Sequence, residues 1–88
     1  MITNDYIILA PQGIHARPAT TLIRLVKNFK SAVSLKRGDK TVRLNSMLNI
    51  LSLTIKGGES VTIIVDGEDE AEAAQAIGLF FTEQLKDL

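Results

Sequence analysis

The hydrophobic residues of this chain change their spacing several times, and this change constrains the fold more than any other feature. Alternation with a period of two indicates a half-buried strand, whereas recurrence every three or four residues indicates a helix. Both patterns occur within 88 residues, a length that leaves room for one core. We therefore expect a single domain over residues 1–88.

Four runs have the composition and spacing of strands. They lie at residues 6–9, 33–36, 41–44 and 60–66. The first run is ended by Pro11 and Gly13, which interrupt regular structure. The second and third runs are separated only by the residues Arg-Gly-Asp-Lys at 37–40, and so short a connection predicts a hairpin.

Three further segments are predicted to be helices. The first has five apolar residues at helical spacing, namely Ala19, Leu22, Ile23, Val26 and Phe29. The second runs from Ser46 to Ile55, where Asn45 or Ser46 can cap the start and Gly57-Gly58 can end the helix. The third follows the acidic residues 68–70, which suit the positive end of a helix dipole. Its apolar stripe comprises Ala74, Ile77, Phe81 and Leu85, with Ala73 and Phe80 beside it.

The order of these elements is strand, helix, two strands, short helix, strand, helix. It predicts an α+β fold of the open-faced sandwich type, with a four-stranded, mainly antiparallel sheet and three helices packed on one face. A domain of this size has little volume to spare beside its core, so a shallow surface site is expected.

Composition excludes several classes of function. Lysine plus arginine equals aspartate plus glutamate at 10 each, and there is one Tyr, three Phe and no Trp. A neutral chain with so few aromatic residues is a poor candidate for binding nucleic acid. The absence of cysteine rules out thiol catalysis and zinc–thiolate sites. Neither a secretory leader nor an apolar run of membrane length is found, so we expect a cytoplasmic protein without a membrane partner.

The segment Gly-Ile-His-Ala-Arg-Pro-Ala at residues 13–19 carries the most chemical information. Gly13 permits an unusual backbone angle just before His15, the only histidine. Pro18 disfavours helical geometry at Arg17 and is tolerated in a first helical turn, so the first helix begins close to this point. The first amides of a helix have no internal acceptor and favour an anion, and the Arg17 guanidinium matches phosphate oxygens.

These properties suit His15 as an acceptor of a phosphoryl group. A neutral imidazole is a nucleophile near pH 7, and the free amides with Arg17 could stabilise the incoming charge. The alternative is an ordinary turn histidine beside a solvated arginine, and the four-residue pattern alone does not decide between them. A single histidine without cysteine argues against a transition-metal site, and the phosphate-binding pattern GxxxxGK[ST] is absent.

The sequence resembles a known family over essentially its whole length. Three stretches carry the resemblance: residues 13–19, residues 45–53 (NSMLNILSL) and residues 65–73 (VDGEDEAEA). They are similar, in order and position, to motifs of the histidine-containing phosphocarrier (HPr) family of the bacterial phosphoenolpyruvate-dependent sugar phosphotransferase system. Three ordered matches are far more specific than the histidine motif alone.

The resemblance implies a mechanism. His15 would receive a phosphoryl group on Nδ1 from phosphorylated enzyme I, which draws it from phosphoenolpyruvate, and would pass it to a histidine of an enzyme IIA protein or domain. Arg17 and the backbone amides of Ala16 and Arg17 would contact the phosphoryl oxygens. The chain would be a monomeric phosphotransfer intermediate without its own small substrate, metal or organic cofactor.

The resemblance also implies a docking surface on the first helix and the short helix. The matching positions are Thr20, Thr21, Arg24, Lys27, Met47, Leu48 and Leu51. Exposed apolar patches bordered by basic residues are typical of interaction sites. Met47, Leu48 and Leu51 could instead belong to the core; we favour docking for Met47 and Leu48 and leave Leu51 open.

Ser46 matches a serine that a dedicated kinase phosphorylates in many members from Gram-positive lineages. A phosphate there would add negative charge to the docking surface, but serine is also a favoured helix cap. Asn45 and Asn49 depart from the common family pattern, in which a lysine often precedes the serine and a glycine or lysine is more usual at the position of Asn49. An Asn-Ser pair occurs in the nitrogen-related branch, so the alternative function is a regulatory paralogue that acts mainly by phosphorylation-dependent binding, for example to transcriptional regulators. We regard Ser46 as a candidate regulatory site for which the cap is the simpler interpretation.

Overall fold

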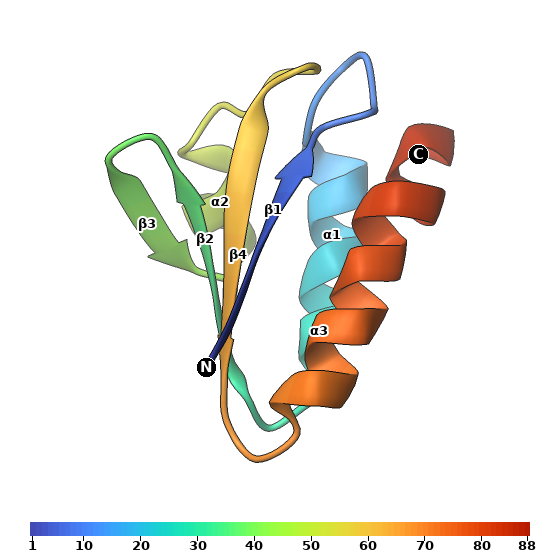
Figure 1. Cartoon of the computed structure of the whole chain (residues 1–88). Coiled ribbons are helices and arrows are strands. Elements are labelled where there is room, and N and C mark those ends of the chain that lie inside the picture. The colour runs from blue at the N-terminus through green and yellow to red at the C-terminus, as the bar shows by residue number, and fades with distance from the viewer.

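The computed structural model describes residues 1–88 as one four-stranded sheet with helices on one of its faces (Figure 1). The elements are β1 (Ile2–Ile7), α1 (Ala16–Val26), β2 (Ala32–Arg37), β3 (Lys40–Arg43), α2 (Met47–Leu51), β4 (Ser60–Asp66) and α3 (Glu70–Leu79). The last helix continues through a wider π turn, Phe80–Gln84, and a tight 3-10 turn, Leu85–Asp87. The predicted order of elements and the α+β class are confirmed. None of the helices has the length and apolar character needed to cross a bilayer.

The sheet has the strand order β1-β4-β2-β3, and every neighbouring pair is antiparallel. Strand β4 has the bounds expected from the sequence and lies between β1 and β2. Its residues alternate between buried and accessible, with Val61, Ile63 and Val65 buried. The predicted hairpin is also present, because Arg37 pairs with Lys40 across a two-residue turn.

The core is formed between the sheet and the helices by 22 buried apolar residues. Phe80 and Phe81 are the largest fully buried side chains. Phe81 stacks on Tyr6 of β1 with ring centroids 5.0 Å apart, so the last helix is fixed against the edge strand. The apolar stripe predicted for this helix is buried throughout.

The first strand begins and ends earlier in the chain than predicted. The sequence placed it at residues 6–9, whereas β1 covers Ile2–Ile7 and pairs with β4 along its whole length, from Ile2 opposite Val65 to Ile7 opposite Ser60. Strand β1 lies at the edge of the sheet, and most of its residues are exposed. Residues 3–5 are therefore polar and do not show the alternation of apolar and polar residues by which a strand is recognised in a sequence.

Two predicted helices end earlier than expected. Helix α1 stops at Val26, so Phe29 lies beyond it, although it still packs against the core. Helix α2 covers only Met47–Leu51 and is not ended by Gly57-Gly58. After α2 the chain turns at Thr54, whose φ is +51°. This turn lets the following apolar residues reach the core without a helix.

Candidate functional site

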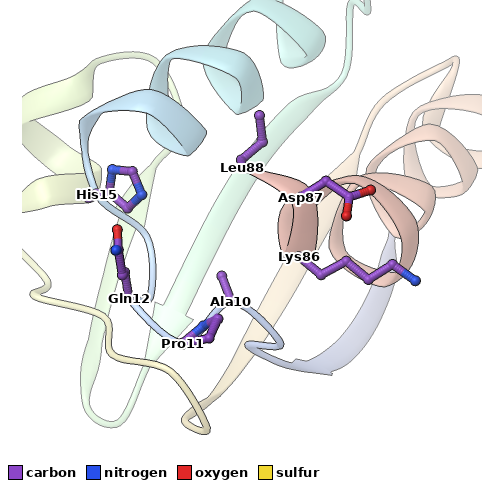
Figure 2. Close-up of a pocket in the computed structure, with 7 residues that line it drawn as sticks. All are labelled: Ala10, Pro11, Gln12, His15, Lys86, Asp87 and Leu88. Atoms are coloured by element: carbon purple, nitrogen blue, oxygen red, sulfur yellow. The ribbon is translucent and has the colours of Figure 1, made fainter.

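His15 is the residue that precedes the first turn of α1. Its backbone is extended, with φ −102° and ψ −167°, and Ala16 is the first helical residue. The helix therefore begins close to Pro18, as expected, although Arg17 is helical in spite of the proline that follows it. Pro18 lies in the first turn and is buried. Figure 2 shows the imidazole of His15 beside Gln12, at the bend of the loop that leads into the helix.

The first turn of α1 has two free backbone donors. Ala19 is the first residue of the helix whose amide is paired, and it donates to the His15 carbonyl at 3.0 Å. Pro18 has no N–H to offer. The amides of Ala16 and Arg17 have no acceptor within the protein, so an anion beside His15 could accept from both.

The His15 side chain is half-buried and lines a pocket of about 230 Å³. Two segments far apart in the sequence form this pocket. One is the loop before α1, and the other is the end of the last helix (Figure 2). The lining residues are Ala10, Pro11, Gln12, His15, Lys86, Asp87 and Leu88.

The contribution of Gln12 and residues 86–88 to this pocket was not predicted from the sequence. The helical periodicity of the last segment extends only to Leu85, and nothing in it indicates which loop its end approaches. In Figure 2 the side chains of Lys86 and Asp87 point away from His15. They border the pocket without approaching the imidazole.

Arg17 is exposed and forms no ion pair within the protein. Its guanidinium therefore has its full set of donors available to a ligand. No group of three or more histidine, aspartate or glutamate side chains could hold a metal ion. The unpaired amides of Ala16 and Arg17 and the unpaired guanidinium of Arg17 are N–H donors, which are suited to an oxyanion.

Gly13 sets the course of the backbone just before His15. Its φ is +72°, a region that favours glycine, as the sequence led us to expect. The next residue, Ile14, donates its amide to the Ile55 carbonyl at 3.1 Å. This contact with the segment after α2 was not visible in the sequence, because it depends on the tertiary arrangement.

The residues predicted for docking lie on two adjacent helices. Arg24 and Lys27 are exposed, and Thr20 and Thr21 are half-buried. Leu48 is 80 % exposed and Leu51 is 37 % exposed, whereas Met47 packs partly against the core. The Thr20 hydroxyl lies 3.2 Å from the Met47 sulfur, which joins α1 to α2. The role of these residues in docking stays a prediction.

Ser46 caps α2. Its hydroxyl accepts a hydrogen bond from the Asn49 amide at 3.2 Å. The Asn49 side chain in turn donates to the Asn45 side chain at 2.9 Å and to the Arg43 carbonyl at 3.2 Å. The two asparagines that depart from the common family pattern therefore bond to each other, and phosphorylation of Ser46 stays a prediction.

Comparison with known proteins shows which proteins this chain is similar to. The family model described as "PTS HPr component phosphorylation site" matches residues 2–83. Phosphocarrier protein HPr of Lysinibacillus sphaericus is 37 % identical over 83 residues, which cover 94 % of each chain. The histidine-containing phosphocarrier protein of Mycoplasma has a solved structure with a TM-score of 0.86 and 34 % identity, covering 90 % of each chain.

A second similar structure is Crh, the catabolite repression HPr of Bacillus subtilis, which was crystallised as a domain-swapped dimer. Its TM-score is 0.76 at 30 % identity, with 97 % of this chain and 98 % of that chain covered. Both phosphocarriers and a regulatory relative are thus similar to this protein. Because the family model covers nearly the whole chain and a phosphocarrier is 37 % identical to it, the chain belongs to the HPr family, the histidine-containing phosphocarrier proteins of the phosphotransferase system.

Proposed function

We propose that this protein accepts a phosphoryl group on Nδ1 of His15 from phosphorylated enzyme I and passes it to an enzyme IIA protein or domain. In each step one phosphorus–nitrogen bond breaks and another forms, so the group moves between histidines without hydrolysis. The chain is then a carrier between two proteins and has no small-molecule substrate of its own. Because phosphoenolpyruvate is produced inside cells, we place this exchange in the cytoplasm and expect the chain to act as a monomer.

The free amides beside His15 are the observation that carries this proposal. The amides of Ala16 and Arg17 have no acceptor within the protein, and the exposed guanidinium of Arg17 has no ion-pair partner. Charge that arrives on a phosphoryl group at the imidazole would meet two amides that the start of the helix already holds in place, and such preorganised donors stabilise developing charge. The Arg17 side chain would add its own donors to this charge.

The exposed apolar side chains next to this site favour transfer within protein complexes. Leu48 is 80 % exposed, and α2 packs beside α1. Arg24 in the last turn of α1 and Lys27 directly after the helix are both exposed. An apolar centre bordered by cations suits a partner whose surface is apolar and acidic. The shallow pocket around His15, of about 230 Å³, leaves the imidazole accessible to a histidine of such a partner.

The central test is phosphorylation by enzyme I. The protein is mixed with phosphoenolpyruvate, magnesium and catalytic amounts of enzyme I, and its mass is measured before and after acid treatment. We expect one added phosphate that is labile in acid and stable in base, as phosphoramidates are. His15→Ala should take up none, whereas the matched variant Gln12→Ala, which alters the same pocket, should still be phosphorylated. Failure of the wild-type protein to gain phosphate, or gain by His15→Ala, would overturn the proposal.

A regulatory role is the second candidate, because Crh is structurally similar to this chain. Both functions use a phosphoryl acceptor, so phosphorylation alone does not separate them. Onward transfer does: phosphorylated protein is mixed with separate sugar-specific enzyme IIA proteins, and loss of phosphate from His15 is followed over time. Rapid transfer to a sugar-specific enzyme IIA supports the carrier. Retention of phosphate with all of them supports the regulatory paralogue.

A further inference from the structure

The loop that carries His15 lies against the segment 53–59, which joins α2 to β4. Three backbone hydrogen bonds connect the two. The Ile55 carbonyl accepts from Ile14 at 3.1 Å, the Ile8 carbonyl accepts from Gly58 at 2.9 Å, and the Glu59 carbonyl accepts from Ile8 at 2.8 Å. The segment therefore supports the loop at both of its ends.

Two glycines allow this close contact, one on each side. A Cβ on Gly13 would lie 2.0 Å from the Ile55 carbonyl oxygen. A Cβ on Gly57 would lie 2.6 Å from the carbonyl oxygens of Ala10 and Pro11. Backbone packs directly on backbone, so a displacement of the segment must be transmitted to the loop.

The segment is held in turn by one ion pair. Arg37, at the end of β2, donates from Nε at 3.0 Å and from Nη2 at 2.6 Å to the same oxygen of Glu59, and from Nη1 at 3.1 Å to the Leu53 carbonyl. The other carboxylate oxygen of Glu59 accepts from the Lys56 amide at 2.6 Å. One guanidinium thus bonds the first and the last residue of the segment.

This ion pair differs from the other ion pairs of the protein. Arg37 and Glu59 are both about one third exposed, whereas each of the other pairs includes a side chain or terminus that is mostly exposed. Hydrogen bonds from Arg37 and from the Lys56 amide hold the pKa of Glu59 below its usual range, so the carboxylate stays charged at neutral pH. Within the segment Thr54 has a φ of +51°, a conformation that a non-glycine residue keeps only when its surroundings hold it.

We propose that Arg37 and Glu59 are positioning residues for His15, which act through segment 53–59 on the backbone that enters α1. Neither side chain lines the pocket at His15, and neither belongs to the docking positions on α1 and α2. Their effect is on the placement of the imidazole and of the free amides beside it. This inference rests on the proposed function, since it concerns the same phosphoryl transfer.

The test separates positioning from docking and from folding. Phosphorylation by enzyme I is measured for Arg37→Gln and Glu59→Gln at a temperature at which circular dichroism shows each variant to be fully folded. We expect kcat to fall about tenfold, because small misplacements of a reacting group are costly, while KM stays unchanged. The double variant should be no slower than the slower single variant, since both changes break the same connection.

Matched controls exist on the same hairpin. Lys40→Gln and Asp39→Asn remove exposed charges that form no ion pair and should transfer at the wild-type rate. If Arg37→Gln fails to fold, Arg37→Lys replaces it. Lysine keeps the charge near Glu59 but cannot also reach the Leu53 carbonyl in a fork geometry, so kcat should still fall. Wild-type kcat in the folded variants, or a rise in KM alone, would overturn the inference.

A second readout is independent of phosphoryl transfer. Hydrogen exchange of the Ile14 amide, which donates to Ile55, reports directly on the contact between segment and loop. Faster exchange in Arg37→Gln than in Lys40→Gln supports the inference, and equal exchange contradicts it. If the wild-type protein takes no phosphate from enzyme I, the proposed function fails, while this measurement still decides whether the ion pair orders the His15 loop.

Discussion

Substitution of Gly13 by alanine is the sharpest test of how the phosphoryl-acceptor loop is held. The added Cβ would lie 2.0 Å from the Ile55 carbonyl oxygen and 2.7 Å from the Cα of Lys56. Ordinary contacts begin at 3.4 Å, so the loop and the segment must separate by about 1.4 Å at this point, because neither backbone can rotate out of the way. The hydrogen bond from Ile14 to Ile55 cannot survive such a separation.

The energetic cost has three sources. Alanine at a positive φ costs about 1–2 kcal/mol, the lost hydrogen bond about 1 kcal/mol and the forced separation about 1–3 kcal/mol. Gly13→Ala should therefore lower the free energy of unfolding by about 3–6 kcal/mol, a large share of the roughly 5–15 kcal/mol that domains have. In the fraction that stays folded, His15 is displaced, and transfer from enzyme I should slow by about a hundredfold.

Gly38→Ala is the matched control. Its φ is +60°, but a Cβ there meets nothing within 4 Å, so it should cost only about 1–2 kcal/mol and leave transfer unchanged. Urea unfolding followed by circular dichroism gives the free energies, and single-turnover phosphorylation gives the rates. Equal losses of stability in the two variants would refute the reasoning, because the backbone conformation would then account for the whole effect and the contact with Ile55 for none.

Three further predictions concern the site, the docking surface and the pH dependence of stability. Arg17→Ala should slow phosphoryl transfer by about 10- to 100-fold, the worth of one charge-assisted contact, with an unchanged melting temperature. Leu48→Asp should raise the KM for enzyme I, since Leu48 is 80 % exposed, whereas Leu79→Asp, at a position 51 % exposed on α3, should not. Hydrogen bonds from the Ser31 hydroxyl and the neighbouring backbone hold the pKa of Asp69 below its usual range. Asp69→Asn should therefore melt at a lower temperature at neutral pH, and its deficit should disappear as the pH falls through that lowered pKa.

Each of these has a clear contradicting outcome. An unchanged transfer rate in Arg17→Ala removes the guanidinium from the mechanism. Equal KM values for Leu48→Asp and Leu79→Asp exclude Leu48 from the docking surface. If the melting temperature of Asp69→Asn stays equally far below that of the wild-type protein in strong acid, the charged carboxylate of Asp69 does not stabilise the fold.

Elements with strong internal patterns could be predicted from the sequence. Strand β4 alternates buried and accessible residues over its whole length, and the last helix carries a continuous apolar stripe. The start of α1 could also be predicted, because proline and the preceding residues restrict the backbone locally. For the same reason unpaired amides in the first turn of α1 could be expected, and the amides of Ala16 and Arg17 are unpaired. Their contact with a phosphoryl group stays a prediction.

Features that depend on distant contacts could not be predicted. The start of β1 is polar because an edge strand needs few apolar residues, and only its pairing with β4 reveals it. Helix α2 ends at Leu51 because Leu53 must turn into the core, where it is 2 % exposed. The contact of Gly13 with Ile55 and the ion pair of Arg37 with Glu59 join residues at least 22 positions apart. No local pattern encodes either contact.

The proline in the first turn of α1 removes one N–H that could otherwise bind a phosphoryl group on His15. The turn offers two free N–H groups, from Ala16 and Arg17, whereas a phosphoryl group presents three terminal oxygens. At least one oxygen must turn to the Arg17 side chain, to water or to a donor that a partner brings. Fixed donors for all three oxygens would stabilise the phosphorylated state further and slow the onward transfer. For a protein proposed to pass its phosphoryl group on, leaving one oxygen without a backbone donor would favour release.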